Sequence, residues 1–211
     1  MSMTYEENAR TNPLETYEWD DIWYDHVPET DKPRILLVGD SISRGYRFPV
    51  IEALKDSYHT DGWATSKAVD NPAYIPQLDL VISQASDYKL IHINNGLHGW
   101  HLSTEDYKDN YEKIICHIQK QYPEIKLVLC LTTPVRNSKT KELADRNSLV
   151  ISRNEAVLEL ALKYDLPVTD LYNSPLLESS ATYTDTVHQT EDGYMLLTGI
   201  VNSKIREVLG K

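Results

Sequence analysis

The sequence predicts an α/β protein, a three-layer α/β/α sandwich with a five-stranded parallel sheet. Short apolar runs typical of strands alternate with longer segments of helical periodicity five times along the chain. The intervening helical segments are long enough for the crossovers that parallel strands need, and such crossovers are right-handed. A chain of 211 residues fits one domain of ordinary size with a single core.

The first predicted strand is the one around which the fold is organised. Four consecutive apolar residues follow Arg34, and Gly39-Asp40-Ser41 comes directly after them. A run that is apolar at every position is typical of a strand buried on both faces. Ligands of open α/β sheets bind beyond the carboxyl ends of the strands, so Ser41 is a candidate reactive group. Gly, Asp and Ser are also ordinary turn residues, and this signal alone favours a plain turn.

The other elements follow in order. Ser103 is expected to cap a helix whose apolar face continues through Ile118. The remaining predicted elements are a helix at 48–54, a strand at 62–66, a helix after Asn71-Pro72, strands at 89–94 and 125–131, a helix at 141–164, a strand at 166–171 and a closing helix at 193–208.

Residues 1–33 are polar and acidic but hold five aromatic residues, too many for a disordered tail. We expect an ordered N-terminal arm whose rings cover part of the domain formed by residues 34–211. For Trp19 and Trp23, stacking against a sugar is the alternative to plain packing. The five aromatic residues are Tyr5, Tyr17, Trp19, Trp23 and Tyr24.

The formal net charge of −11 is spread along the chain, which argues against nucleic acid and anionic membrane surfaces as partners. No apolar run approaches the roughly 20 residues needed to cross a bilayer, so no membrane insertion is expected. The first residues are acidic and polar, where a signal peptide would be basic and then apolar. We expect a soluble chain, cytoplasmic as written, and secreted or periplasmic if a leader was trimmed.

A second chemical signal lies just before the closing helix, where Asp185 precedes His188 by three residues. On a turn, such a carboxylate can accept the ring N–H and leave the other ring nitrogen free to act as a base. A loop aspartate and an exposed histidine are the alternative. A serine hydroxyl needs a base of this kind to become a nucleophile. The loop follows the fifth strand, so Ser41 and His188 are expected at the same edge of the sheet.

Together the two motifs resemble those of the GDSL esterases, also called SGNH hydrolases. Gly39-Asp40-Ser41-Ile42 matches the first block of that family, and Asp185 and His188 followed by Gly193-Tyr194 match the last. The resemblance covers roughly residues 34–208 and implies a flavodoxin-like SGNH hydrolase fold. It implies Ser41 as nucleophile, His188 as general base and later acid, and Asp185 as the residue that orients the ring, with no cofactor.

The family also implies an oxyanion hole built from three donors. These are the serine backbone N–H, a glycine N–H after the second strand and an asparagine side chain after the third. Here the first donor is Ser41, and Ser66 stands at the position of the glycine. Matching the third donor on its neighbouring glycine selects His98, and matching on side-chain type selects Asn95 or Asn94. All three stay open.

The expected activity is cleavage of a carboxylic ester through an acyl-enzyme intermediate. A small-molecule or carbohydrate ester with a small acyl group would suit an open cleft flanked by Trp100 and Tyr46. Asn94 and Arg136 are candidate substrate-binding residues, although Arg136 also fits a plain surface arginine. Two alternatives remain: a catalytically weakened carbohydrate-binding or scaffold protein, and an O-acyltransferase.

No metal site is predicted from the sequence. His92, His98 and His101 fall on a strand, a turn and a loop, without the spacing that is typical of metal ligands. Cys116 and Cys130 are expected to be buried thiols that form neither a disulfide nor a metal pair.

Overall fold

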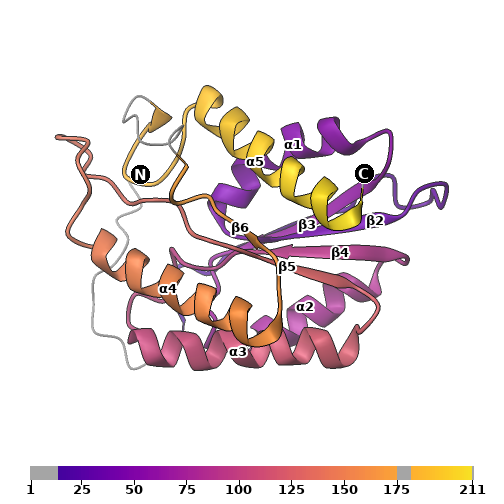
Figure 1. The fold of residues 1–211 in the computed structure, drawn as a ribbon, viewed down its shortest axis with the longest axis horizontal. Helices are drawn as coiled ribbons and strands as arrows, with labels where there is room; N and C mark the ends of the chain where they lie inside the picture. The colour runs from indigo at the N-terminus through magenta and orange to yellow at the C-terminus, as the bar shows by residue number, and fades with distance from the viewer. Residues whose placement is uncertain (1–13, 175–181, 211) are drawn as a thin grey trace.

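A six-stranded sheet lies between two layers of helices in the computed structural model, which describes residues 14–174 and 182–210 (Figure 1). Five of these strands pair in parallel, and the first pairs antiparallel at one edge. The three-layer α/β/α prediction is confirmed, with one strand more than expected. The spatial order is β1 (Asp20–Trp23), β3 (His59–Thr65), β2 (Arg34–Gly39), β4 (Tyr88–Ile93), β5 (Lys126–Cys130) and β6 (Val168–Thr169).

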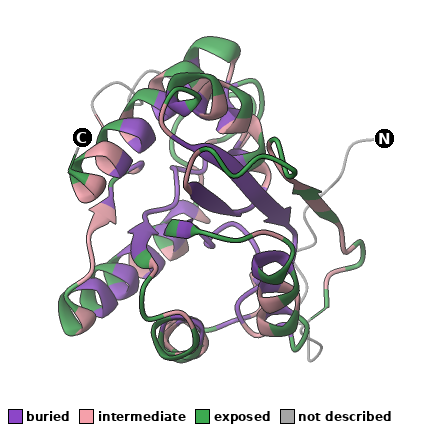
Figure 2. Ribbon diagram, turned by 90° about the vertical axis from the view of Figure 1, so that its right-hand side faces the viewer, coloured by how far each residue is buried: buried purple, intermediate pink, exposed green. Residues whose placement is uncertain are grey.

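Strand β2 separates the two halves of the core. Ile35 and Leu37 contact one apolar cluster, which includes α1 (Ser41–Leu54) and α5 (Glu191–Leu209). Leu36 and Val38 contact the other cluster, on the opposite face of the sheet. All six residues of β2 are buried, as predicted, and Figure 2 shows the central strands enclosed by the helices. The second cluster is completed by α2 (Tyr74–Ser83), α3 (Thr104–Gln121) and α4 (Asn147–Tyr164).

Two helix boundaries differ from the prediction for local reasons. Helix α1 begins at Ser41 and not at 48, because the Asp40 side chain caps it by accepting the Ile42 N–H at 2.8 Å. Helix α4 begins at Asn147 and not at 141, because the preceding residues form an antiparallel bridge between Arg136 and Leu143. The predicted cap of α3 is confirmed, since Ser103 Oγ accepts the N–H of Asp106 at 3.0 Å.

The described part of the predicted arm, residues 14–33, supplies β1, which pairs with β3 in the register Asp20 to Thr65 and Trp23 to Gly62. The arm is thus continuous with the sheet of the domain, while the division of the chain at residue 33 stays a prediction. Two acidic residues and a half-exposed pattern made this edge strand hard to recognise in the sequence. Tyr5, one of the arm aromatics, lies outside the described residues.

The two cysteines differ in exposure. Cys130 is buried on β5 as predicted, whereas Cys116 is exposed, so its predicted burial was wrong. The buried face of α3 includes the neighbouring Ile115 and Ile118, and Cys116 lies off that face. Both cysteines are free thiols. Within 14–174 and 182–210, none of the helices combines the length and apolarity of a membrane-spanning helix.

Glycine-to-alanine substitutions at Gly62 and Gly199 should change the stability in opposite directions, because only Gly62 is packed against the arm. A Cβ at Gly62 would lie 1.9 Å from Cζ2 of Trp23, so Gly62→Ala must displace the indole ring and destabilise the protein by about 1–3 kcal/mol. A Cβ at Gly199 on α5 meets nothing within 4 Å, so Gly199→Ala should stabilise by about 0.5–1 kcal/mol. Chemical denaturation of both variants measures this. An unchanged stability for Gly62→Ala would contradict the observed packing of Trp23.

Candidate active site

Ser41, His188 and Asp185 form one chain of hydrogen bonds beyond the carboxyl end of β2. His188 Nε2 lies 2.9 Å from Ser41 Oγ, although the two residues are 147 positions apart in the sequence. Its other nitrogen, Nδ1, lies 2.7 Å from Asp185 Oδ2. A carboxylate on Nδ1 holds the proton there, so Nε2 can accept the hydroxyl proton of the serine. The structure thus brings together the three residues that the sequence motifs singled out.

The Asp185 carboxylate is held by its own loop as well as by the histidine ring. Its Oδ1 accepts the backbone N–H groups of Val187 and His188, both at 2.8 Å. Burial acts to raise the pKa of Asp185, but these hydrogen bonds and the histidine ring outweigh burial and leave the pKa below its ordinary value of 3.8. Arg136 N–H donates to the Thr186 carbonyl at 2.8 Å, which ties the loop to the segment after β5.

Ser41 is placed by the start of α1. It is the first residue of the helix, so its backbone N–H lies at the positive end of the helix dipole, a favourable place for developing negative charge. Asp40, directly before it, is fully buried, and burial raises the pKa of this carboxyl. Ser43 Oγ donates to the Asp40 carbonyl at 2.8 Å and strengthens the same turn. The predicted role of Ser41 N–H as an oxyanion donor fits this location.

The three residues are open to solvent. The side chains of His188 and Asp185 are 34% and 51% exposed, respectively. A hollow of about 450 Å³ lies elsewhere, between α5 and β6, and none of the three residues lines it. His188 and Asp185 thus lie at the surface of the molecule and not in this hollow.

Ser66, the expected second oxyanion donor, is occupied by the arm. Its backbone N–H donates to the Trp19 carbonyl at 3.1 Å. Its hydroxyl donates to Glu18 Oε2 at 2.7 Å and accepts the Trp19 N–H at 2.8 Å. The oxyanion role of Ser66 stays a prediction, and it requires Trp19 to give up this bond.

Asn94 and Asn95 are buried and connect loops to one another. The Asn94 amide donates to the Cys130 carbonyl at 2.9 Å and to Thr132 Oγ1 at 3.3 Å. The Asn95 amide donates to the Lys67 carbonyl at 2.9 Å. These bonds weigh against Asn94 as a substrate-binding residue and against either residue as an oxyanion donor, roles that remain predictions.

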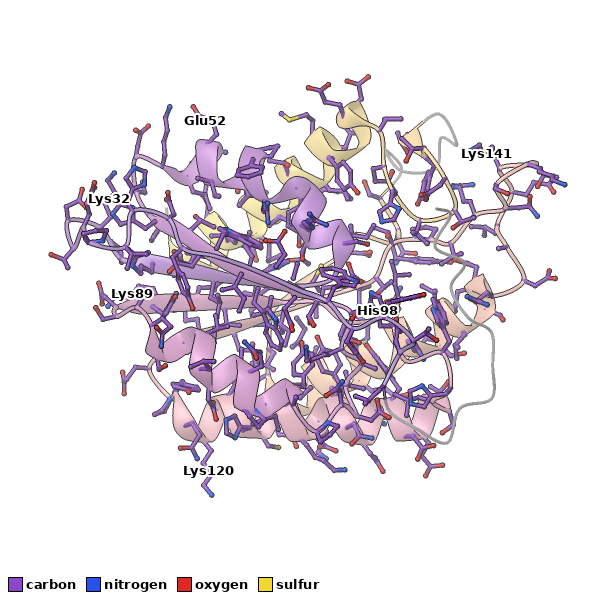
Figure 3. All side chains as sticks on the ribbon, turned by 180° about the vertical axis from the view of Figure 1, so that it is seen from behind. Lys32, Glu52, Lys89, His98, Lys120 and Lys141 are labelled. Carbon is purple, nitrogen blue, oxygen red and sulfur yellow. The ribbon has the colours of Figure 1, made fainter. Side chains whose placement is uncertain are left out.

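His98 is also buried, at the same end of the sheet (Figure 3). Its Nδ1 lies 3.0 Å from Glu15 Oε1, and its ring meets Trp19 edge to face at 6.3 Å. Burial acts to lower the pKa of His98, but the hydrogen bond and charge of Glu15, together with the charge of Asp40, raise it overall. Its oxyanion role likewise stays a prediction. Glu15 and Glu18 were not singled out in the sequence, because only the folded arm brings them to these loops.

Arg153 is a positioning residue that the sequence analysis missed. Its guanidinium is fully buried and donates to the carbonyls of Gly96 at 2.9 Å, His98 at 2.8 Å and Gly99 at 2.6 Å. The conformation of the loop after β4 therefore depends on this side chain of α4. A signal was available, because Arg153 falls among the buried positions of α4, where a charged residue is unusual.

The remaining predicted substrate contacts are engaged within the protein. Trp100 is half-buried, with the guanidinium groups of Arg146 and Arg153 at 4.8 and 5.1 Å from its ring centre. Arg136 donates to the Lys141 carbonyl at 3.0 Å and lies 5.1 Å from the ring centre of Tyr183. As substrate-binding residues Trp100 and Arg136 stay predictions.

Tyr46 is 1% exposed, so the expectation that it flanks an open cleft was wrong. It lies on the inner face of α1 and packs into the core.

The three histidines that were examined for metal binding have separate partners. His92 Nε2 lies 2.9 Å from Thr169 Oγ1, and burial lowers the pKa of His92 to about 4. His101 Nε2 lies 2.7 Å from Asp70 Oδ2, and His98 contacts Glu15.

Comparison with known proteins assigns the chain to a family. The model of the GDSL-like lipase/acylhydrolase family matches residues 37–196. GDSL esterase/lipase CPRD49 of Arabidopsis thaliana is 24% identical over 165 residues, which cover 69% of this chain and 64% of that protein. GDSL esterase/lipase WDL1 of Oryza sativa subsp. japonica is 29% identical over 153 residues, covering 63% of this chain and 57% of that protein. The match thus spans less than two thirds of either relative.

Solved structures share the fold. A putative acylhydrolase from Bacteroides fragilis superposes with a TM-score of 0.68 at 18% identity, covering 87% of this chain and 92% of that one. The acetyl xylan esterase AlAXEase superposes with a TM-score of 0.64 at 20% identity, covering 81% and 98%. The acetylxylan esterase Axe2 of Geobacillus stearothermophilus superposes with a TM-score of 0.64 at 16% identity, covering 82% of this chain and 94% of that one. The fold and the family match agree, and the chain belongs to the GDSL-like lipase/acylhydrolase family.

Proposed function

We propose that this chain is a serine hydrolase that cleaves carboxylic esters through an acyl-enzyme intermediate. The observation that carries the proposal is the contact of 2.9 Å between Ser41 Oγ and His188 Nε2, with Asp185 on the opposite side of the ring. Membership of a family of lipases and acylhydrolases supports the same reaction class. A serine, a base and an orienting carboxylate in this order are the parts that acyl transfer requires.

The proposed reaction begins when His188 Nε2 takes the proton of Ser41 Oγ, which attacks the ester carbonyl carbon. Negative charge develops on the carbonyl oxygen, and the amino end of α1 stabilises it. The imidazolium, paired with Asp185, then gives its proton to the departing alcohol oxygen. In the second half, His188 activates a water that attacks the acyl-enzyme, and Ser41 is released with its proton.

We propose a small acyl ester, with a carbohydrate as the alcohol, as the substrate class. The exposed side chains of His188 and Asp185 fit a bulky alcohol that stays outside the protein surface. Two proteins of the same fold are described as acetyl xylan esterases, which motivates the same class here. In an O-acyltransferase a second alcohol would replace the water, so product analysis with a competing sugar acceptor distinguishes the two reactions.

Replacing the nucleophile should abolish covalent labelling. Ser41→Ala should no longer react with a fluorophosphonate probe, because only an activated serine hydroxyl attacks the phosphorus. Ester turnover should fall by about 10⁴-fold or more. Ser203→Ala, which removes an exposed hydroxyl from α5, is the matched control and should label like the native chain. Labelling that persists in Ser41→Ala would exclude Ser41 as the nucleophile.

The orienting role of Asp185 predicts a large loss of rate with little loss of stability. Asp185→Asn should keep the conformation of the loop but can place an amide N–H against Nδ1, which favours the wrong tautomer of His188. The kcat for p-nitrophenyl acetate should therefore fall by about 10⁴-fold. In His188→Ala, kcat should fall by a similar factor, because His188 and Asp185 act as a unit. If native chain and His188→Ala turned over the ester equally slowly, the protein would instead be a binding or scaffold member of the fold.

The pH dependence of kcat/KM should not come from Asp185. The lowered pKa of Asp185 means that its stabilising charge is present above 3.8 and is lost only as the pH falls through its lower folded-state value. Asp185 stays ionised near neutral pH, and only a neutral imidazole can accept the serine proton, so acidification should lower kcat/KM. A profile of kcat/KM against pH measures this, and a flat profile would contradict it.

A control separates the proposed base, His188, from the buried ring of His98. Glu15→Gln removes the charge that raises the pKa of His98 and should leave the pH profile in place. A profile that moved with Glu15→Gln would assign the titration to His98.

A further inference from the structure

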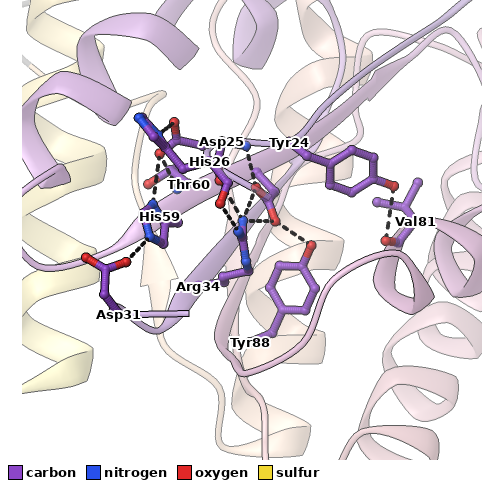
Figure 4. A network of polar contacts seen from close by, with 10 residues as sticks. Tyr24, Asp25, His26, Asp31, Arg34, His59, Thr60, Val81 and Tyr88 are labelled. Carbon is purple, nitrogen blue, oxygen red and sulfur yellow. Dashed lines mark hydrogen bonds and ion pairs between the residues drawn. The ribbon is translucent and has the colours of Figure 1, made fainter. Parts of the chain in front are cut away.

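A second cluster of histidines and carboxylates lies at the amino ends of β2 and β3, at the opposite end of these strands from Ser41. The loop between β1 and β2 brings Asp25 and His26 beside His59, the first residue of β3 (Figure 4). One potential ligand atom from each of the three residues lies within 4.8 Å of the other two. Figure 3 shows Lys32 of the same loop at one end of the molecule, away from His98.

The contacts of the His59 ring favour a cation beside it. The residue is 2% exposed, and its Nε2 lies 2.8 Å from Asp31 Oδ1, where it donates its proton. The other ring nitrogen, Nδ1, lies 3.6 Å from Asp25 Oδ2, beyond hydrogen-bonding distance, so a ring nitrogen and a carboxylate oxygen face one another without a direct hydrogen bond. A carboxylate that orients the far nitrogen of a ligating histidine is the arrangement typical of metal sites.

The other oxygen of Asp25, Oδ1, faces the ring of His26. His26 Nδ1 lies 2.6 Å from Asp25 Oδ1, and the two imidazole rings are 5.4 Å apart, tilted by 30°. The His26 side chain is 59% exposed, so the site is open to an ion and to water from this side.

The backbone of this loop is held independently of any ion. His26 adopts a left-handed conformation with φ 48°, and the Arg34 guanidinium donates to the carbonyls of Asp25 at 2.8 Å and His26 at 2.9 Å. The Asp25 N–H donates to Asp61 Oδ1 at 2.8 Å. The positive charge of Arg34 is in turn balanced by Asp61 at 2.7 Å. Asp25 Oδ2 accepts the Thr60 N–H at 3.3 Å, while the carboxylate makes no direct ion pair with Arg34 and faces both rings.

We propose that Asp25, His26 and His59 bind a zinc ion through one carboxylate oxygen and the two Nδ1 atoms, with Asp31 orienting His59 and the ion displacing the proton that His26 Nδ1 donates to Asp25 Oδ1. Two imidazoles and a carboxylate form a common zinc ligand set, and water completes the tetrahedron on the exposed side. The ion would join the loop between β1 and β2 to the start of β3. The site lies at the opposite end of these strands from Ser41, so the ion would take no part in the proposed hydrolase activity.

The test measures zinc binding by the full chain after treatment with a chelator. Titration calorimetry with ZnCl₂ should show one ion per chain, and zinc should raise the melting temperature. His26→Ala alters a largely exposed side chain and Asp25→Asn keeps its shape, so both should fold. Each should weaken zinc binding by at least about tenfold, and Asp31→Asn should weaken it by about 10- to 100-fold through the orientation of His59.

Two matched controls exclude other histidine and carboxylate pairs. His117 Nε2 lies 2.7 Å from Asp79 Oδ1, and His188 Nδ1 lies 2.7 Å from Asp185 Oδ2. His117→Ala and His188→Ala should bind zinc like the native chain. The proposal is overturned if native chain binds no zinc, if His26→Ala and Asp25→Asn bind it as tightly as native chain, or if binding is lost in a control. Circular dichroism of each variant checks that the fold is retained.

Discussion

The turn from β2 into α1 is the constraint on which the arrangement around Ser41 depends. Strand β2 is buried on both faces, so its position in the sheet is set by two apolar clusters. A Cβ at Gly39 would lie 2.6 Å from Ser43 Oγ, so the helix can start this close to the strand only because residue 39 is a glycine. Asp40 then caps α1 and leaves Ser41 at its first position. Ser41 is therefore positioned by packing and capping together.

Buried polar groups hold the loops that surround this turn. Arg153 donates to three carbonyls of the loop after β4, and Asn95 joins that loop to the one after β3. From the arm, Glu15 contacts the loop after β4 and Trp19 contacts the loop after β3. A single hydrogen bond adds only about 1 kcal/mol of net stability, but a buried group without its partner costs about 1–3 kcal/mol. The network therefore restricts the loops to one arrangement more than it stabilises the fold. The arm belongs to this network, although the family match begins only at residue 37.

The two ends of the same strands carry different polar groups. At the carboxyl end the side chains of His188 and Asp185 are open to solvent, which suits the proposed ester substrate. At the amino end Arg34 and Asp61 form a fully buried ion pair, and the Tyr88 hydroxyl donates to the same carboxylate at 2.7 Å. Removing one partner of such a pair costs about 3–5 kcal/mol. This rigid centre keeps His59 and the loop of His26 in place for the proposed zinc ion.

Much of the fold, and the grouping of Ser41, Asp185 and His188, could be predicted from the sequence alone. The apolar run of β2 specified a strand buried on both sides, because every residue in it avoids water. The spacing of Asp185 and His188 specified a local contact, because a three-residue turn brings the two side chains together. Cys116 was misassigned because a single small apolar residue does not reveal which side of a helix it occupies.

Only the tertiary structure decided the surroundings of these motifs. Residues far apart in sequence, such as Glu15 and His98 or Arg153 and Gly96, meet through long-range packing that no local pattern encodes. The acidic strand β1 became visible only through its pairing with β3, because an edge strand needs a partner and not an apolar face. In this protein the sequence by itself determined the five parallel strands, the cap of α3 and the two motifs that contain Ser41, Asp185 and His188. The structure decided which hydrogen-bond donors near Ser41 are occupied, because that depends on where the arm and the loops meet in space.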